Sequence, residues 1–304
     1  MQRMTTHILA AGMFAFIAAA APAAVVDSAE ALWKFDAADA GSVSLAQVVD
    51  SNNGHDATSL SNAGLMNWTT TPADGPTVDL YTDHGRGLQL NPTVQTPGDP
   101  EDTVNAAGYA VNGFTVTGSA TFATRFKWDG FANDDASGQS AWLYNNGHGA
   151  STGWLVGIQN LGGQTRIGQF QYLNGAMRSP ASMVINTGVW YDLVVVMLNA
   201  AEEGAGSDQL RFFLQADGGT VQTAVINGAV NATSAANTYV GSEALGTGAG
   251  NTRKAFDGTV DYIGVWDSAL ADEQATSILV PEPTSISVIG LLGGAAMLRR
   301  RRRA

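Results

Sequence analysis

Residues able to perform catalysis are present in this sequence, but they are not spaced as in a recognisable catalytic site. Gly149-Ala150-Ser151-Thr152-Gly153 has the G-x-S-x-G spacing, in which a nucleophilic serine lies on a sharp turn between a strand and a helix. Here the strand-like residues Trp154-Leu155-Val156 follow the motif, so we expect an ordinary loop. The sequence has no H-E-x-x-H, Walker A or G-x-G-x-x-G motif for a metal, a phosphate or a dinucleotide.

Acidic residues are numerous, yet the adjacent pairs are poor catalytic couples. Glu101-Asp102, Glu202-Glu203 and Asp272-Glu273 lie in expected loops or at a helix start. Neighbouring residues of a strand point to opposite faces, whereas glycoside hydrolysis needs two carboxylates on either side of one bond, about 5–10 Å apart. We therefore assign no catalytic residues.

Aromatic residues are the first candidates for ligand binding, because their rings offer flat apolar surfaces on which sugars stack. Trp142 and Tyr144 are the best placed, since they share a parity on one strand-like segment and lie between polar loops. We expect both to be exposed; packing in the core is the alternative for each.

A calcium site is the second candidate, formed by Asp36, Asp50, Asn52 and Asp261. Calcium prefers several oxygen ligands from carboxylates and carbonyls. Asp261 is a carboxylate in a largely apolar segment and so needs a partner, either a cation or a set of backbone N–H donors. Solvated acidic turns are the alternative interpretation of the other positions.

The charge of the chain excludes one class of partner. Its net charge is −12, and setting aside both ends leaves 9 basic against 26 acidic residues, or −17. Such a surface repels phosphate backbones, so we expect no nucleic-acid binding. It also favours neutral sugars over anionic polymers, unless calcium bridges the charges. The chain has no cysteine, so the exported domain expected here has no disulfides and depends on its core.

The N-terminus has the pattern of a signal peptide, residues 1–23. Arg3 and His7 precede an apolar run over 8–20, and Ala21-Pro22-Ala23 supplies the small residues that a signal peptidase reads. We expect cleavage after Ala23 or Ala24. An uncleaved anchor is the alternative.

The C-terminus, residues 280–304, has a Pro-Glu-Pro motif, an apolar run over 286–298 and five consecutive arginines. As a helix, this run would reach only about 20 Å, against a hydrocarbon core of about 30 Å, which indicates transient membrane engagement with the arginines on the cytoplasmic side. This three-part order resembles the PEP-CTERM sorting signal. The resemblance implies processing by an exosortase in a Gram-negative-type bacterium that makes extracellular polysaccharide; a permanent tail anchor is the alternative. The predicted processing signal comprises Pro281, Glu282, Pro283, Arg299, Arg300, Arg301, Arg302 and Arg303.

The remaining segment, 24–279, is predicted to be one all-β domain. Short apolar runs alternate with turn pairs such as Asp217-Gly218, and helical periodicity is confined to 268–278. Residues 71–108 have the composition of a long loop. The expected strands are Ala120–Trp128, Trp154–Gln159, Arg166–Tyr172, Trp190–Leu198, Leu210–Gln215, Thr220–Ile226 and Thr259–Trp266, with the fifth and sixth forming a hairpin.

Five spaced segments of this domain carry a family resemblance: 32–36, 49–57, 188–195, 238–241 and, most closely, 256–270. In this order they resemble the strands of laminin-G-like domains. The resemblance implies a concanavalin A-like, two-sheet jelly-roll sandwich, although the chain lacks the Glu-x-Asp-x-x-Glu strand of concanavalin-like glucanases.

Together these features predict an exported surface or extracellular-matrix protein whose sandwich binds a glycan or another surface partner without catalysis. A polysaccharide-active enzyme and a purely structural matrix component are the alternatives.

Overall fold

The computed structural model describes residues 25–35, 41–69, 87–94, 104–131, 140–147, 153–171, 176–228, 230, 237–242 and 254–279. The predicted signal peptide and the predicted sorting signal, with Pro281–Pro283 and Arg299–Arg303, lie outside these residues. Within the described part of the chain, no helix is both long and apolar enough to cross a bilayer.

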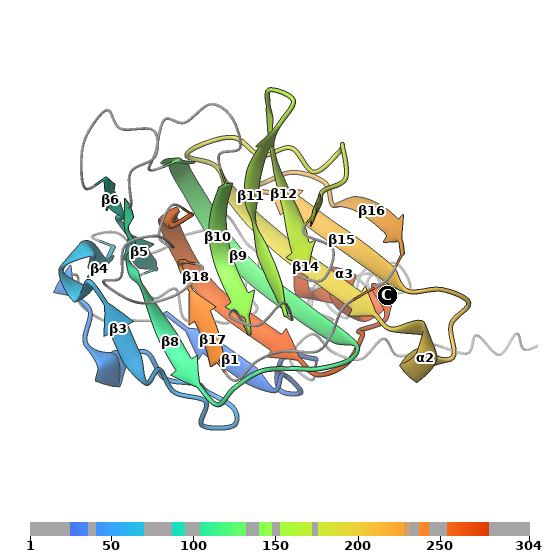
Figure 1. The fold of residues 1–304 in the computed structure, drawn as a ribbon, viewed down its shortest axis with the longest axis horizontal. Helices are drawn as coiled ribbons and strands as arrows, with labels where there is room; N and C mark the ends of the chain where they lie inside the picture. The colour runs from blue at the N-terminus through green and yellow to red at the C-terminus, as the bar shows by residue number, and fades with distance from the viewer. Residues whose placement is uncertain are drawn as a thin grey trace, which may run out of the picture.

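Two antiparallel sheets pack face to face, which confirms the predicted all-β sandwich of jelly-roll type (Figure 1). We call the seven-stranded sheet nearest the viewer in Figure 1 the front sheet and the nine-stranded sheet the back sheet. In spatial order, the front sheet consists of β13 (Ala176–Arg178), β12 (Gln164–Gln171), β11 (Trp154–Leu161), β10 (Ser140–Asn146), β17 (Asn237–Val240), β8 (Gly108–Asn112) and β3 (Ser59–Ser61). The back sheet consists of β16 (Gln222–Asn227), β15 (Gln209–Ala216), β14 (Trp190–Leu198), β9 (Ala120–Phe131), β18 (Phe256–Trp266), β5 (Leu88–Leu90), β4 (Met66–Trp68) and β2 (Gly41–Ser42), with β1 (Ala31–Lys34) also paired to β18.

The sequence pattern placed several of these strands correctly. β14 has the predicted bounds, and β15 and β16 form the predicted hairpin, with Phe212 opposite Ala224. The expected long loop over 71–108 is partly wrong, because it contains β5, which pairs with β4 and β18, and the short pair β6 (Thr93–Val94) and β7 (Val104–Asn105). Strands of two or three residues are too short to show an alternation.

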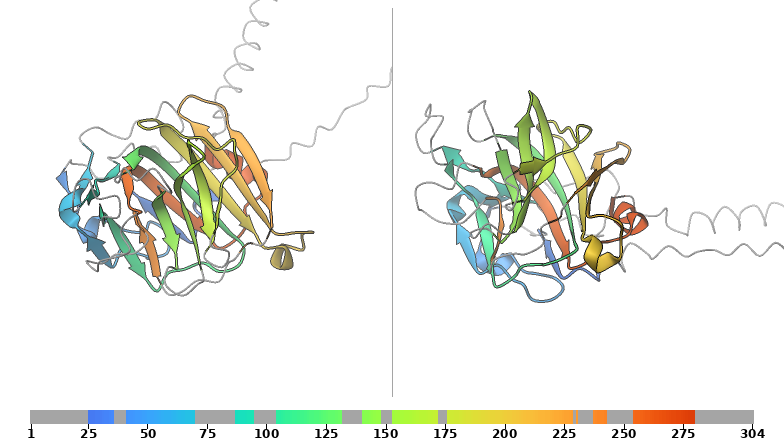
Figure 2. Two further views of the ribbon diagram at one scale, coloured as in Figure 1. Left: turned by 45° about the horizontal axis from the view of Figure 1, so that its top comes forward. Right: turned by 45° about the vertical axis from the view of Figure 1, so that its right-hand side comes forward.

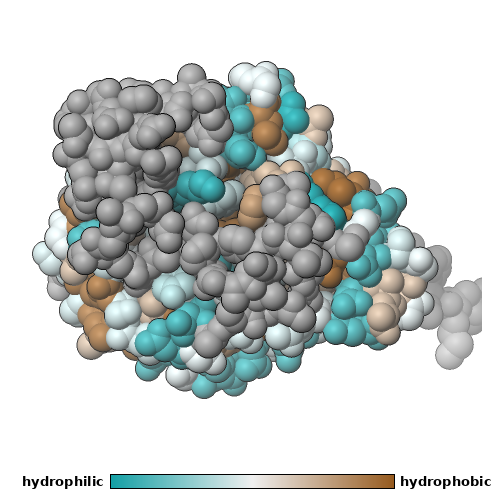
Figure 3. Space-filling view, in the orientation of Figure 1, coloured by the Kyte–Doolittle hydropathy of each residue, from teal (hydrophilic) through white to brown (hydrophobic). Residues whose placement is uncertain are grey.

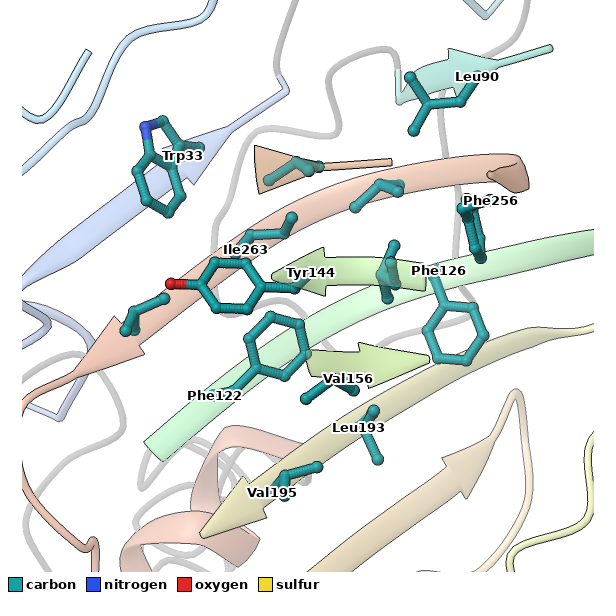
Figure 4. Packing of buried hydrophobic residues seen from close by; sticks show 14 of the residues in the cluster. Trp33, Leu90, Phe122, Phe126, Tyr144, Val156, Leu193, Val195, Phe256 and Ile263 are labelled. Carbon is teal, nitrogen blue, oxygen red and sulfur yellow. The ribbon is translucent and has the colours of Figure 1, made fainter. Parts of the chain in front are cut away.

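The core lies between the two sheets (Figure 4). The back sheet contributes Phe122 and Phe126 from β9 and Ile263 from β18, and the front sheet contributes Tyr144 and Val156. These side chains are all fully buried. Burying an apolar side chain of this size stabilises a fold by about 1.5–3 kcal/mol, so a core of this size holds the domain without disulfides.

A third layer covers part of the outer face of the back sheet. Helix α3 (Asp272–Leu279) and the segment Val25–Ala29 pack there on Val194, Val196 and Phe213. The indole Nε1 of Trp266 donates a hydrogen bond to the carbonyl of Val25 at 2.9 Å. Figure 2 shows α3 on the side of the back sheet away from the front sheet. This part of the back sheet is therefore buried on both faces.

Candidate functional site

The predicted exposure of Tyr144 is wrong. Its ring lies in the core, with its centroid 4.9 Å from that of Phe122 and 5.2 Å from that of Trp154, and none of its surface is exposed (Figure 4). Burial raises the pKa of the Tyr144 phenol, which stays neutral. Tyr144 contributes to the fold and cannot contact an external ligand.

Trp142 lies on the opposite face of β10 from Tyr144, because the register of β10 against β11 shifts between these two residues. An extra residue at such a bulge reverses the expected parity. The ring of Trp142 lies against Gly157 of β11, where a Cβ would be 2.4 Å from its Cε3 atom. Trp142 is only 2% exposed, so the prediction that it is an open stacking surface is also wrong.

The outer face of the front sheet carries a cross-strand row of mixed character. Tyr239, Asn145, Leu155 and Phe170 stand opposite one another on β17, β10, β11 and β12. Asn145 and Leu155 are buried, while Tyr239 and Phe170 at the two ends of the row are partly exposed. With strands about 4.8 Å apart, these two rings stand about 14 Å apart, which suits an elongated ligand. Figure 3 shows this side of the molecule, where hydrophilic and hydrophobic residues are interspersed among those drawn in colour.

Polar atoms on this outer face lack hydrogen-bond partners among the described residues. They are Nε1 of Trp142, Oε1 of Gln159 and Nε of Arg166. Gln159 and Arg166 are directly paired across β11 and β12, next to the Gly157–Gly168 pair on which Trp142 lies. Buried polar atoms are normally satisfied, and those that are not require a water or a ligand. We call Trp142, Gln159, Arg166, Phe170 and Tyr239 the front-face site.

Of the predicted calcium ligands, Asp50 and Asn52 lie together, and the carboxylate of Asp50 is held by backbone donors. The carboxylate of Asp50 accepts backbone N–H groups from Leu32 at 2.7 Å and Asn52 at 3.0 Å on Oδ1, and from Asn53 at 3.0 Å and His55 at 2.9 Å on Oδ2. These four donors use the four acceptor positions of an ionised carboxylate. Burial by itself raises the pKa of Asp50, but the four N–H donors outweigh it and lower the pKa.

The other predicted ligands have different surroundings. The side chain of Asn52 donates to the carbonyls of Val26 and Ala29, and Asp36 lies outside the described residues. β1 lies between Asp50 and Asp261. On one side, Trp33 of β1 forms a β-bridge with Asp50; on the other, the N–H of Phe35, just beyond that strand, donates to the carbonyl of Asp261. No group of three or more His, Asp or Glu residues among the described residues is arranged to hold a metal ion. Calcium binding by Asp36, Asp50, Asn52 and Asp261 stays a prediction.

Asp261 occupies a bulge in β18, where the register shifts between Val260 and Tyr262. Val260 and Tyr262, which regular strand alternation would place on one face, therefore lie on opposite faces: Val260 is in the core between the sheets, and Tyr262 is in the cluster that includes α3. The charge of Asp261 acts on Arg125, a buried arginine of β9.

Arg125 forms a buried ion pair that sequence reasoning missed. Its Nη1 is 2.6 Å from Oδ2 of Asp192 on β14, and Asp217 is 3.4 Å from Nη2. Burial alone would lower the pKa of Arg125, but the carboxylates of Asp192, Asp217 and Asp261 raise it. β9 and β14 are adjacent in space and far apart in sequence. Only knowledge of which residues pair across these two strands could have revealed that Arg125 lies opposite Asp192.

A pair of carboxylates at one end of the back sheet was missed for the same reason. Asp257, the second residue of β18, pairs with Gly130 of β9, and Asp129 precedes Gly130 on that strand. Burial, together with the charge of Asp129, raises the pKa of Asp257 to about 6. A raised pKa next to a second carboxylate is also found in acid–base couples, so this pair is the described feature that most favours an enzyme.

We expect Asp257→Asn to stabilise the protein at pH 7.5 and to have little effect at pH 4. A carboxyl whose pKa is raised on folding contributes stability that is complete below its unfolded pKa of about 3.9 and is lost as the pH rises through the folded value of about 6. The melting temperature should increase by about 2–4 °C for each kcal/mol gained. The exposed Asp267→Asn is the control, and an equal effect of both variants at pH 7.5 would contradict the expectation.

No protein-family model and no curated protein matches the chain. Solved structures resemble it at low identity. A native heptameric SAP-like pentraxin of Limulus polyphemus is 13% identical, with a TM-score of 0.41 over 62% of this chain and 81% of the pentraxin. The CBM40 of Ruminococcus gnavus IT-sialidase, bound to α2,3-sialyllactose, is 15% identical, with a TM-score of 0.38 over 54% and 84% of the two chains. Trypanosoma rangeli sialidase is 13% identical, with a TM-score of 0.43 over 83% of this chain and 32% of the sialidase. Because these values are low, we infer function from the site alone.

Proposed function

We propose that the protein is an exported bacterial surface or matrix protein whose front-face site binds a glycan without cleaving it. The observation that carries the proposal is the combination, on one sheet face, of partly exposed aromatic rings with unsatisfied polar atoms. Sugars have C–H faces that stack on rings, and hydroxyl groups that both donate and accept hydrogen bonds. Arg166 offers N–H donors and Gln159 offers a side-chain amide at this face, and both side chains are partly exposed.

Export and sorting are part of the same proposal. They are supported by the signal-peptide pattern of residues 1–23 and by the Pro-Glu-Pro, apolar and arginine segments of residues 280–304. In this proposal an exosortase processes the tail, and the sandwich meets extracellular polysaccharide afterwards.

Affinity electrophoresis of the full chain in gels that contain polysaccharides tests the binding. Replacing Gln159 and Tyr239 with alanine should weaken retention roughly tenfold, because it removes one hydrogen-bond acceptor and one ring. The matched control is Gln222→Ala with Val225→Ala, two exposed residues of β16 on the back sheet. Thermal melts should show that all variants fold.

The same preparations decide between binding and catalysis. We expect no new reducing ends when the chain is incubated with a polysaccharide that retains it. If reducing ends accumulate with the parent chain and not with Asp257→Asn, the protein is an enzyme. If no polysaccharide retains the chain, or if the front-face variant is retained as well as the parent, the proposed function is wrong.

A further inference from the structure

The two sheets differ in charge. In a chain with 27 acidic and 15 basic residues, the seven strands of the front sheet contain no Asp or Glu. The strands of the back sheet contain Asp129, Asp192, Asp257 and Asp261. The described carboxylates are thus absent from the sheet that carries the front-face site.

Three of the four positive charges on the described strands of the back sheet are paired with carboxylates; the fourth is Lys34 of β1. Arg125 pairs with Asp192, Lys127 with Asp129 at 3.7 Å, and Arg211 with Asp272 at the start of α3. None of these three cations has its charge free for an external anion.

Two cations at the front-face site are not neutralised by any described carboxylate. Arg166 donates from Nη2 to the side-chain oxygen of Gln164, an uncharged group, and its Nε has no partner among the described residues. Lys254 lies beside β10 with its Nζ 5.4 Å from the ring centroid of Trp142. Both side chains are partly exposed. The face thus presents two cations that no described carboxylate neutralises, next to the buried ring of Trp142.

Resting on the function proposed above, we infer that the glycan bound at the front-face site is anionic and carries carboxylate or sulfate groups. Both cations are donors only, and they complement an acceptor-rich oxyanion better than a neutral sugar. Arginine in particular binds carboxylate and sulfate oxygens through its planar fork of N–H donors. The negative net charge of the chain repels an anionic polymer, but salt screens this repulsion beyond about 8–10 Å. The affinity at contact therefore depends on the local charges, which at this face are the two cations. The sequence-based preference for neutral sugars is thereby reversed.

The test compares retention of the full chain by dextran, polygalacturonate and dextran sulfate, with EDTA present so that calcium cannot bridge the charges. We expect both anionic polymers, or one of them, to retain the chain roughly tenfold more strongly than dextran, and we expect retention to fall between about 20 mM and about 200 mM salt. Comparing the retention by polygalacturonate with the retention by dextran sulfate shows whether the site prefers carboxylate or sulfate groups.

The variant Arg166→Gln with Lys254→Gln should lose roughly tenfold in retention by the anionic polymers. Lys34→Gln with Lys127→Gln, on the back sheet, makes the same change in net charge and should behave like the parent. If dextran retains the chain as strongly as the anionic polymers, or if both double variants lose retention equally, the inference is wrong while glycan binding stands. If none of the three polymers retains the chain, the proposed function itself fails.

Discussion

Replacing Asp192 with alanine is expected to lower the free energy of unfolding by about 3–5 kcal/mol, a large part of the total stability of an ordinary domain. The side chains of Asp192 and Arg125 are 7% and 5% exposed, so the variant leaves a buried guanidinium with only the more distant charges of Asp217 and Asp261 to compensate it. Urea unfolding followed by circular dichroism measures the change.

The control for this prediction is a second ion pair in a different environment. Asp272, whose side chain is 59% exposed, pairs with Arg211, and Asp272→Ala should cost less than about 1 kcal/mol because water screens the pair. Replacing both members of the buried pair, as Arg125→Met with Asp192→Leu, should recover most of the loss, since no buried charge remains. Equal losses from Asp192→Ala and Asp272→Ala would show that the buried pair has no special role.

Replacing Asp50 with alanine is expected to lower the free energy of unfolding by about 2–4 kcal/mol, because four backbone N–H groups lose their acceptor. The site is only partly exposed, so water replaces the lost carboxylate incompletely. Asp50→Asn should lose less, since one oxygen remains to accept. Urea unfolding at pH 7 compares both variants with the parent.

The pH dependence of this effect has a definite sign. The pKa of Asp50 is lowered on folding, so its contribution is present above the unfolded value of about 3.9 and is lost as the pH falls through the folded value. The difference in the free energy of unfolding between the parent and Asp50→Asn, called the gap here, should therefore become smaller as the pH falls below about 4. We expect the gap at pH 7 to be the same in EDTA and in calcium; a gap that appears only with calcium would return Asp50 to a metal site.

The sandwich was predictable because its longest strands show their alternation locally. Trp190–Leu198 and the hairpin turn at Asp217-Gly218-Gly219 are examples in which neighbouring residues alone determine strand and turn. The short strand β5 was missed because its three residues join the sheet through long-range pairing rather than through a local pattern.

The errors at the candidate site have one physical cause. A β-bulge separates Trp142 from Tyr144 and another separates Val260 from Tyr262, and each places on opposite faces two residues that simple alternation puts on the same face. Bulges arise from the fit between paired strands, which the sequence of one strand does not contain. The idea that backbone donors can hold a carboxylate could be foreseen from chemistry; that four such donors hold Asp50 required the fold.

The third layer, on the outer face of the back sheet, determines from which side the domain can be attached to another structure. Val25 and Leu279, at the two ends of the described domain, belong to the same buried cluster, and the front-face site lies on the other side of the sandwich. A tether that continues from α3 would therefore attach to the domain on the side of the back sheet and leave the front-face site pointing away from the point of attachment. The same neighbourhood of ends suits the domain for grafting into a surface loop of a host protein, because both junctions would meet at one point.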